Sequence, residues 1–168
     1  MIVGSISEDL SLEKRVAITP DTVKKYKTLG LDVCLKKSYA SHLGISDDQY
    51  AKEGASFLET NEEIISKSDA ILQLNILKDD DLNKLKQNQI LVGVLNPYVN
   101  EKKIKEISSK NIKCFSLELL PRITRAQSMD ILSSQANLAG YKAVVDSFAY
   151  YQKAIPMMMT AAGTISAA

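Results

Sequence analysis

Two apolar segments flank a charged one in "DAILQLNILKDDDLNKLKQNQILVGVLN", residues 69–96. Residues 69–76 and 89–96 are rich in Ile, Leu and Val, which is typical of buried strands. Residues 78–87, "KDDDLNKLKQ", are mostly charged and polar, and we expect a helix there. A strand, a helix and a second strand in this order predict a βαβ unit, in which the two strands run parallel.

The same alternation continues toward the amino terminus. Residues 1–7, "MIVGSIS", and 31–37, "LDVCLKK", are expected strands. Between them, residues 15–30 predict a helix with Thr19 or Asp21 as its amino-terminal cap and Gly30 at its end. Residues 46–57 and 60–69 are interpreted as short helical segments.

Toward the carboxyl terminus, residues 100–111 predict an amphipathic helix whose Ile104 and Ile107 face inward. Residues 111–120, "NIKCFSLELL", predict a further strand. Strands and helices that alternate at this spacing indicate the α/β class. We expect a Rossmann-like, mostly parallel sheet with helices on both faces, followed by a long connecting helix.

Composition excludes several classes of function. A chain of 168 residues that is 45% apolar is long enough for one domain with a sizeable core. Lys and Arg number 21 against 20 for Asp and Glu, so bulk charge does not favour nucleic acid or a membrane surface. No apolar run approaches the roughly 18 residues of a membrane span. The first 15 residues also lack the pattern of a signal peptide. We therefore expect no nucleic-acid partner and no direct insertion into a membrane.

The chain is poor in metal-binding and nucleophilic side chains. Cys34 and Cys114 lie in separate strand-like segments, and His42 is the only histidine. Together they form no zinc-binding pattern, and no nucleophile-elbow motif accompanies His42. We expect two free thiols and no metal site.

Phosphate-binding loops are absent from the sequence. The seven glycines are scattered, and neither GxGxxG nor GxxxxGK[ST] occurs. If this protein handles a dinucleotide, the turn that cradles the pyrophosphate is missing from the chain.

A polar stripe runs through "PRITRAQSMDILSSQANLAGYKAV", residues 121–145. Much of this segment predicts a helix that is apolar nearly all round, for which a protein interior is the expected place. Five polar residues recur at i+3 and i+4 spacing and would share one side: Gln127, Asp130, Ser134, Asn137 and Tyr141. Either this side faces solvent, or it lines a ligand cleft in which buried polar groups find partners.

These motifs together resemble a known family. "RVAITP" (15–20), the segment 121–145 and "MMMTAAGTI" (157–165) are similar to the alpha subunit of proton-translocating NAD(P) transhydrogenase. More broadly, they resemble the amino-terminal domain that this subunit shares with alanine dehydrogenase. In that family the Gly-rich NAD-binding fold begins just after the segment that "MMMTAAGTI" resembles. The resemblance therefore implies an amino-terminal α/β domain at residues 1–125. Residues 126–168 would be the connecting helix and the start of a missing NAD-binding domain.

The resemblance also implies roles for individual residues. In the family, a loop carrying Arg, Gln and Asp reaches over the nicotinamide end of NAD, and Arg122, Gln127 and Asp130 match these positions. A serine of the following helix contacts the nicotinamide carboxamide, and Ser133 matches it. The implied cofactor is NAD, bound here through its nicotinamide end only. The implied partners are a second copy in a homodimer, a membrane component and an NADP-binding component, at the cytoplasmic face of a membrane.

The alanine dehydrogenase branch makes a further demand on the sequence. Those enzymes bind pyruvate with the arginine of "RVA", which Arg15 matches, and need a lysine and a histidine at two strand ends. This chain has Asn75 and Asn96 at those positions, and asparagine cannot act as a general acid or base at neutral pH. Taken alone, Arg15 is better explained as a solvated residue of a surface loop before a proline-led helix start. Dehydrogenation of an amino acid is therefore disfavoured against transhydrogenation.

One alternative comes from another class of protein. The chain could be a non-catalytic module that serves dimer contacts or docking to partner subunits. In either case we expect the isolated chain to be inactive, because the fold that holds most of NAD is not part of it.

Overall fold

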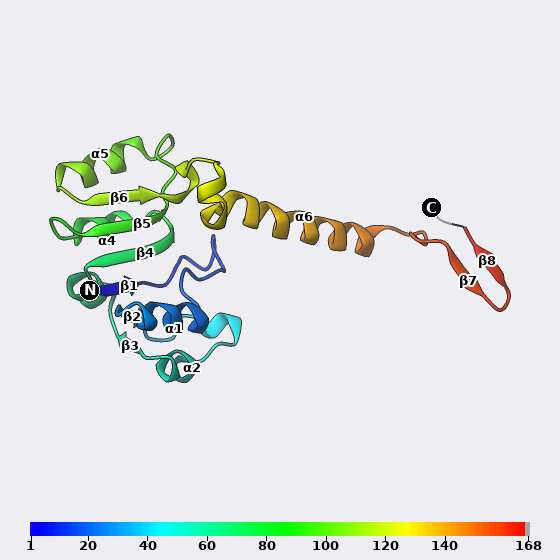
Figure 1. Ribbon diagram of the computed structural model, residues 1–168, viewed down its shortest axis with the longest axis horizontal. Coiled ribbons are helices and arrows are strands. Elements are labelled where there is room, and N and C mark those ends of the chain that lie inside the picture. Colours follow the sequence, from blue (N-terminus) through cyan, green and yellow to red (C-terminus); the bar gives the residue numbers. More distant parts are fainter. Residues whose placement is uncertain (167–168) are drawn as a thin grey trace. The chain divides into compact units, whose positions relative to one another are not determined.

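The computed structural model describes residues 1–166, and the chain divides into two units, Met1–Pro121 and Arg122–Ala168. The first unit contains one six-stranded sheet with the strand order β3-β2-β1-β4-β5-β6 (Figure 1). All five strand pairs are parallel. The strands are β1 (Ile2–Ser5), β2 (Asp32–Lys36), β3 (Ala55–Leu58), β4 (Ala70–Asn75), β5 (Ile90–Val94) and β6 (Lys113–Ser116).

Helices follow most of these strands. They are α1 (Pro20–Thr28), α2 (Asp47–Lys52), α3 (Asn61–Lys67), α4 (Asp79–Asn83) and α5 (Glu101–Ser109), with short 3₁₀ turns at Ser41–Leu43 and Leu117–Leu119. From β1 the chain first builds β2 and β3 on one side, and then returns to build β4, β5 and β6 on the other. The direction of strand addition therefore reverses between β1 and β4, and open α/β sheets bind ligands at such a point.

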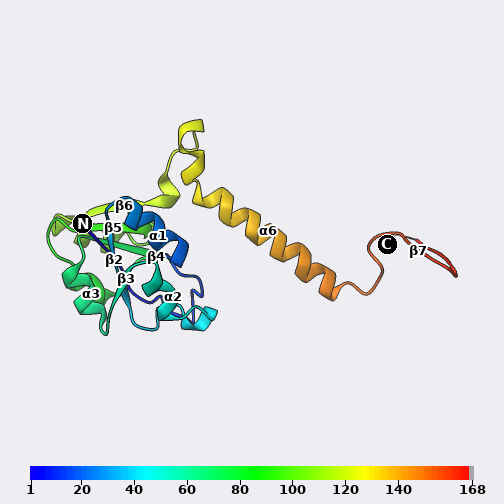
Figure 2. The same ribbon diagram turned by 60° about the horizontal axis from the view of Figure 1, so that its bottom comes forward.

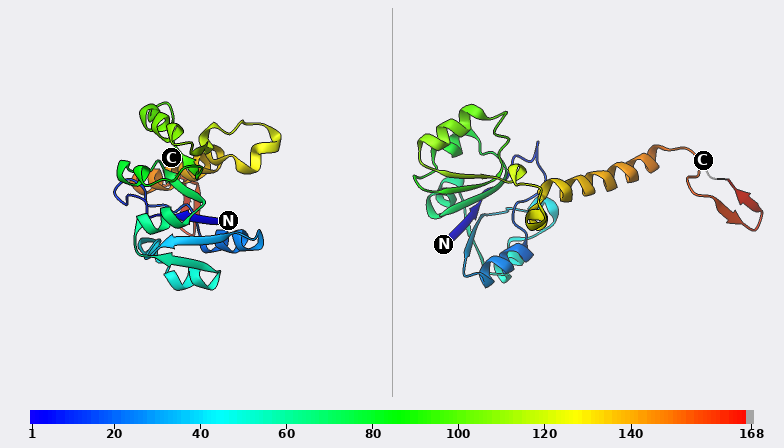
Figure 3. Two further views of the ribbon diagram at one scale, coloured as in Figure 1. Left: turned by 90° about the vertical axis from the view of Figure 1, so that its left-hand side faces the viewer. Right: turned by 45° about the horizontal axis from the view of Figure 1, so that its top comes forward.

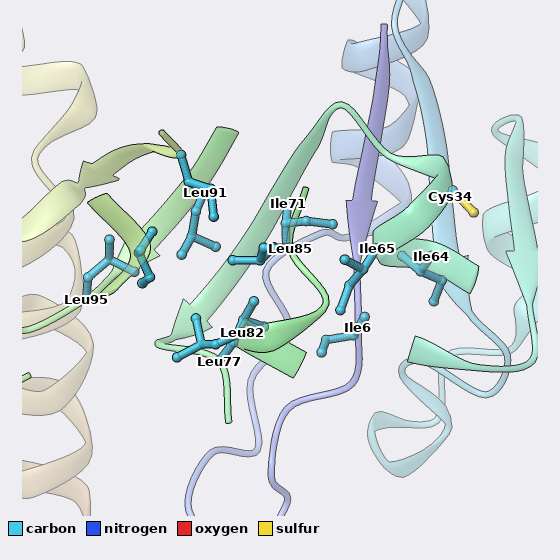
Figure 4. Close-up of a cluster of buried hydrophobic side chains, with 12 residues drawn as sticks. Ile6, Cys34, Ile64, Ile65, Ile71, Leu77, Leu82, Leu85, Leu91 and Leu95 are labelled. Carbon is cyan, nitrogen blue, oxygen red and sulfur yellow. The ribbon is translucent and has the colours of Figure 1, made fainter. Parts of the chain in front are cut away.

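Two separate cores cover the two faces of the sheet. On one face, α3, α4 and α5 supply Ile64, Leu82 and Ile107, which pack against residues such as Ile71 and Leu91. Figure 4 shows Ile71 of β4 beside Leu85, which follows α4. The other face is packed by α1 and α2, and Figure 2 shows β2 and β3 between these two helices and α3. The α/β fold with a Rossmann-like parallel sheet and helices on both faces is confirmed.

Side-chain caps set the starts of α1 and α3. Thr19 accepts a hydrogen bond from the Thr22 N–H at 3.3 Å, so of the two expected caps for α1, Thr19 is the one used. Gly30 lies just past this helix with a φ of 74°, where a residue without Cβ is favoured. At α3, Thr60 and Glu63 form a capping box. The sequence analysis offered Thr19 or Asp21 for α1, and it did not predict the capping box of α3.

The prediction of helix throughout residues 46–57 is wrong in its second half. The helix α2 ends at Lys52, and Ala55–Leu58 form the edge strand β3. The cause is Gly54, whose φ of 98° lies outside the helical region and turns the chain into the strand. The helix expected at 78–87 is also shorter, ending at Asn83.

Gly93 allows β5 to approach β4 closely. A Cβ at this position would lie 2.4 Å from the Gln73 carbonyl oxygen, which is too close for any other residue without a shift of backbone. The register between β4 and β5 is irregular in the same region, between Leu72 and Asn75. This close approach therefore lies near the end of β4 that faces the strand reversal.

The described part of the second unit contains a 3₁₀ segment, a long helix and a hairpin of two strands. Thr124–Met129 form a 3₁₀ segment, Ile131–Tyr150 form the 20-residue helix α6, and β7 (Met158–Thr160) pairs antiparallel with β8 (Gly163–Ile165). Figure 3 shows α6 as one unbroken helix and the hairpin in red. Residues 126–168, for which a connecting helix was expected, contain α6. Residues 167–168 of this segment lie outside the described residues.

Candidate functional site

Arg122, Asp130 and Ser133 form one hydrogen-bonded group at the start of α6. Asp130 is the amino-terminal cap of the helix and accepts hydrogen bonds from the Ser133 N–H at 3.0 Å and the Ser133 hydroxyl at 2.6 Å. The Arg122 guanidinium lies 3.3 Å from an Asp130 oxygen and donates to Ser133 Oγ at 2.9 Å. Three of the four residues that the sequence singles out are therefore in mutual contact.

The charge of Asp130 is well stabilised within this group. Hydrogen bonds from the Ser133 side chain and backbone, together with the positive charge of Arg122, hold the pKa of Asp130 below its ordinary value. The carboxylate is therefore ionised at neutral pH and can only accept hydrogen bonds. The Arg122 side chain is 70% exposed, so part of its guanidinium stays open to a ligand.

Gln127 lies in the 3₁₀ segment that precedes this group. Its backbone carbonyl accepts from the Asp130 N–H at 3.2 Å, and its side chain is exposed. Within the described residues no hydrogen bond of its side-chain amide is found. A free primary amide can both donate to and accept from another amide, which is the pattern that a carboxamide ligand presents.

The expectation of one continuous polar stripe on a helix is only partly met. Gln127 and Asp130 precede α6, because Asp130 captures the Ser133 N–H and begins the helix at Ile131. Only Ser134, Asn137 and Tyr141 lie on the helix itself. The expectation of a buried helix is wrong for this chain, since no residue of α6 is buried. Of the two interpretations of the polar stripe, the structure of this chain agrees with exposure to solvent, because Ser134, Asn137 and Tyr141 are all exposed.

A second polar site lies in the first unit, at the strand reversal between β1 and β4. A cleft of about 450 Å³ opens there, and its lining includes Ile6, Glu8, Leu12, Gln73, Asn75 and Ile76. Glu8 lies three residues beyond β1, while Gln73 and Asn75 belong to the end of β4. The cleft therefore occupies the place where α/β sheets most often hold small ligands.

The Glu8 carboxylate ties the segment after β1 to the end of β4. Its Oε1 accepts from the Leu74 N–H at 2.6 Å and from Gln73 Nε2 at 3.1 Å. Asn75 Nδ2 lies 3.4 Å from Oε2. Burial nevertheless outweighs these bonds, and the pKa of Glu8 is raised above its ordinary value. The surroundings of Glu8 therefore disfavour the ionised form of its carboxyl group.

A chain of buried hydrogen bonds leads from this carboxylate to the "RVAITP" segment. The Gln73 Oε1 accepts from Ser5 Oγ at 2.9 Å, and Ser5 Oγ lies 2.7 Å from the Tyr39 hydroxyl. The same hydroxyl accepts from the Ala17 and Ile18 N–H groups at 3.1 and 3.3 Å. The loop that carries Arg15 is therefore held in place by the floor of the cleft.

Arg15 is paired with a neighbouring carboxylate. Its Nε and Nη2 donate to the two oxygens of Glu13 at 2.8 and 2.6 Å, a bidentate pair that lowers the pKa of Glu13 to about 2. Asn75 lies at the end of β4, near Glu8. Asn96 follows β5 with a φ of 46°, and its N–H donates to Glu118 at 2.6 Å. No acid or base replaces the lysine and histidine at these two positions.

Sequence reasoning missed Glu8 and Gln73. A signal existed for each: Gln73 is a polar residue inside the apolar run 69–76, and Glu8 follows directly on the strand-like run 1–7. Gln73 is only 5% exposed, so its amide needed buried partners, and Ser5 and Glu8 supply them.

Two negative findings apply to the described residues. They contain no group of three His, Cys, Asp or Glu side chains arranged to hold a metal ion. Among residues 1–166, no helix combines the length and the apolar character that crossing a membrane requires.

Comparison with known sequences gives one family. A family model described as "Alanine dehydrogenase/PNT, N-terminal domain" matches residues 4–139. The chain is 42% identical to a protein of Rickettsia prowazekii that is named as the first part of "NAD(P) transhydrogenase subunit alpha", over 99% of this chain and 45% of that protein. The protein of the same name from Rhodospirillum rubrum is 39% identical, over 91% of this chain and 41% of its own length. "Alanine dehydrogenase 1" of Staphylococcus aureus is 27% identical, over 92% of this chain and 40% of its own length.

Comparison with solved structures agrees with this. A transhydrogenase structure from Sinorhizobium meliloti superposes with a TM-score of 0.91 at 40% identity, over all of this chain and 50% of that one. An L-alanine dehydrogenase structure gives a TM-score of 0.66 at 17% identity and shows the shared fold. The resemblance that the sequence motifs indicated is confirmed. The chain spans less than half the length of the two transhydrogenase relatives named above.

Proposed function

The chain belongs to the alanine dehydrogenase/PNT N-terminal domain family, and we propose that it forms part of the NAD(H)-binding component of an NAD(P) transhydrogenase. In the complete enzyme, NADH held by this component reduces NADP held by another, coupled to proton translocation. The supporting observation is the identity of 42% and 39% with two transhydrogenase alpha subunits over nearly the whole chain.

The alanine dehydrogenase reading is weaker on two grounds. The similarity falls to 27% for that branch. In addition, Asn75 and Asn96 stand where the resemblance implies a lysine and a histidine, and Arg15 is paired with Glu13. Hydride transfer between two nicotinamide rings needs no such acid and base, because the protein contributes position and electrostatics.

Arg122, Gln127, Asp130 and Ser133 are proposed to face the nicotinamide end of NAD. NADH would supply the hydride when bound, and the four side chains would help to hold its ring in place. Gln127 offers a free amide for the carboxamide or ribose, and Arg122 offers its exposed guanidinium. Asp130 and Ser133 fix the Arg122 side chain through the contacts at 3.3 and 2.9 Å.

The 168-residue chain by itself is proposed to be inactive. No Gly-rich phosphate turn occurs in it, so the helix amino terminus that binds a pyrophosphate has to come from elsewhere. On this reading residues 1–125 are the amino-terminal domain, and residues 126–168 lead into the NAD-binding domain. The partners are a second copy in a homodimer, the membrane component and the NADP-binding component. The assembly lies on the cytoplasmic face of the membrane.

A non-catalytic assembly role is the second candidate. It is favoured by α6, which exposes large apolar side chains including Leu138, Val144 and Phe148. Such surface marks contact with other protein. In this reading the Arg122 group merely caps and orients the helix.

Replacing Gln127 by alanine separates the two candidates. Because the side chain is exposed and makes no hydrogen bond within the described residues, the change should alter the stability of the chain by about 0.5 kcal/mol or less. In an assembly that includes the Gly-rich NAD-binding segment, it should slow single-turnover hydride transfer far more than it weakens NADH binding. Most binding energy comes from pyrophosphate and adenosine contacts, whereas Gln127 would position the ring.

Ser134→Ala is the matched control. Ser134 lies on α6, and its hydroxyl donates to the Ile131 carbonyl of the same helix, so hydride transfer should stay unchanged. An unaltered rate in the Gln127→Ala assembly, with NADH bound normally, would contradict the catalytic reading and favour the assembly module.

A further inference from the structure

Two cavities of the first unit have three lining residues in common. The cleft at the strand reversal has a volume of about 450 Å³. A second cavity of about 710 Å³ is lined by residues of α3 and α4. We call the residues that line both cavities, Asn61, Lys78 and Asp81, the shared wall.

The shared wall differs from the positions that the alanine dehydrogenase branch uses. Of those three positions, Asn75 lines only the cleft at the strand reversal. Arg15 and Asn96 line neither of the two cavities. A ligand on the shared wall would therefore occupy a different place from the substrate of that branch.

Asp81 is a buried carboxylate with no cation beside it. Only 8% of this residue is exposed. Its Oδ2 accepts a hydrogen bond from Asn61 Nδ2 at 3.0 Å. Within residues 1–166 the side chain has no ion pair, and its Oδ1 accepts no hydrogen bond. Because buried charges in proteins are normally paired, Asp81 lacks a cationic donor.

The neighbouring amide of Asn61 lacks a donor as well. Its Oδ1 is buried and has no hydrogen-bond partner among the described residues. The amide cannot be reversed, because its oxygen would then face the Asp81 carboxylate. Two acceptors that need donors therefore lie on adjacent side chains. A primary ammonium group, with one positive charge and three N–H donors, satisfies both of them.

The lining of the two cavities carries an excess of negative charge. Six carboxyl groups face three lysines, and the carboxyl groups are those of Glu8, Asp9, Glu62, Glu63, Asp80 and Asp81. Even with Glu8 neutral, the excess remains. Two of the lysines, Lys78 and Lys84, already pair with carboxylates of the lining at 2.7 and 3.5 Å. Asp80 is exposed, lines the second cavity with Asp81 and has no ion pair within the described residues. The lining therefore favours a ligand with two positive charges over one with a single charge.

Two other classes of ligand fit the shared wall less well. The described residues contain no group of three His, Cys, Asp or Glu side chains arranged to hold a metal ion, and Ca²⁺ needs six or more oxygen ligands. A zwitterion could place its carboxylate near Lys36, which lines the cleft and has no ion pair within the described residues. Its net charge of zero would leave the excess of carboxylates uncompensated.

We propose that a short aliphatic diamine binds at the shared wall. One ammonium group donates to Asn61 Oδ1 and to the Asp81 carboxylate, and the other pairs with Asp80. The carbon chain between them has no polar group to satisfy. This site is independent of hydride transfer and goes beyond the proposed function.

Titration calorimetry of the chain with three amines tests the proposal without any substitution. Putrescine should bind in a saturable manner, and butylamine, which has one ammonium group, should bind more weakly. Tetramethylammonium carries a positive charge without an N–H donor, so it should bind at least tenfold more weakly than putrescine. Added salt should weaken putrescine more than butylamine, because two charges are screened in place of one.

Matched substitutions assign the two ammonium positions. Asp81→Asn should weaken both amines at least tenfold, whereas Asp80→Asn should weaken putrescine and leave butylamine unchanged. Asp48→Asn is the control, because Asp48 is an exposed residue of α2 that lines neither cavity. Thermal melts establish that each variant is folded. Asn61→Ala, which should also weaken both amines, provides the same measurement if Asp81→Asn fails to fold.

Four outcomes would overturn the proposal. Absence of putrescine binding would contradict it outright, and equal binding of tetramethylammonium would reduce it to attraction by surface charge. Displacement of putrescine by an equal concentration of Mg²⁺ would indicate a metal site in its place. Tighter binding of γ-aminobutyrate than of putrescine, with a loss in Lys36→Gln, would indicate a zwitterion. None of these readouts involves a nucleotide, so they leave the proposed function untouched.

Discussion

The two units of the chain use apolar residues in opposite ways. In Met1–Pro121, Leu91, Ile71 and Ile107 are at most 1% exposed inside the sheet–helix core. In the described residues of Arg122–Ala168, Ala126 is the only buried apolar residue, although α6 is as apolar in composition as a core helix. An apolar, helix-forming sequence thus suffices to make a helix, but its burial requires surfaces that a neighbouring element supplies.

The largest expected difference between the units comes from removing one leucine in each. Leu91→Ala should lower the free energy of unfolding of the first unit by roughly 2–5 kcal/mol, because Leu91 is fully buried between β5 and the helices. Leu138→Ala, at a position that is 57% exposed on α6, should cost less than about 0.5 kcal/mol. Urea unfolding followed by circular dichroism measures both. Equal costs would show that α6 is packed in the isolated chain.

Glycine substitutions sharpen the same comparison. Gly93→Ala should destabilise the first unit by roughly 1–3 kcal/mol, since the new Cβ would meet the Gln73 carbonyl oxygen at 2.4 Å. Gly140→Ala has the opposite sign, because nothing lies within 4 Å and alanine favours the helix by about 1 kcal/mol. The melting temperature should therefore fall for Gly93→Ala and rise for Gly140→Ala. A loss of stability at Gly140 would reveal a close contact on α6.

The ionised carboxylate of Asp130 is expected to stabilise the start of α6. Asp130→Ala removes the cap, so the first turn of α6 should fray and helical circular dichroism should fall, while Asp130→Asn should retain most of the signal. In the native chain the folded pKa of Asp130 is lowered. The stabilisation it provides is therefore complete above the ordinary pKa of an aspartate, and is lost as the pH falls through the folded value. A pH titration of helicity that is identical in Asp130→Asn would contradict this assignment.

Glu8 should give the smallest effect, and one of opposite sign. Its folded pKa is raised, so its contribution to stability is fully present below the ordinary pKa of a glutamate and is lost as the pH rises through the folded value. Glu8→Gln keeps an oxygen for the Leu74 N–H, so that stability near neutral pH should change little. The dependence of stability on pH in the weakly acidic range should flatten. Leu10→Ala, at an exposed position in the same loop, serves as the control and should leave the dependence unchanged.

The βαβ order of residues 69–96 was enough to predict the α/β class, because each element carries its own period and length. The edge strand β3 was missed because its four residues follow a helix directly, and only the positive φ of Gly54 separates the two. Such a dihedral is a property of the folded backbone. The resemblance singled out Arg122, Gln127, Asp130 and Ser133, and their role stays a prediction. The spacing of Gln127 and Asp130 suggested one helix face with Ser134, whereas the structure has Asp130 as the cap of α6.

The cleft at the strand reversal was not predictable in the same way. Glu8 and Gln73 are 65 residues apart, and only the parallel pairing of β1 with β4 brings them together. A polar residue in an apolar run indicates that it has hydrogen-bond partners, but the sequence does not identify them. Register across a sheet is set by many weak side-chain contacts, and the sequence of one strand does not contain it.

The alternation of side chains along β2 also places a thiol where its modification rate can report on the opening of the sheet. Val33 and Leu35 point into one core while Cys34, between them, points into the other, and all three are at most 1% exposed. A thiol reagent can therefore reach Cys34 only when the sheet itself opens. Its rate of modification, with Cys114 removed, reports how often the core around it opens. An opening free energy equal to the global free energy of unfolding would mean that the two faces of the sheet unfold as one cooperative body.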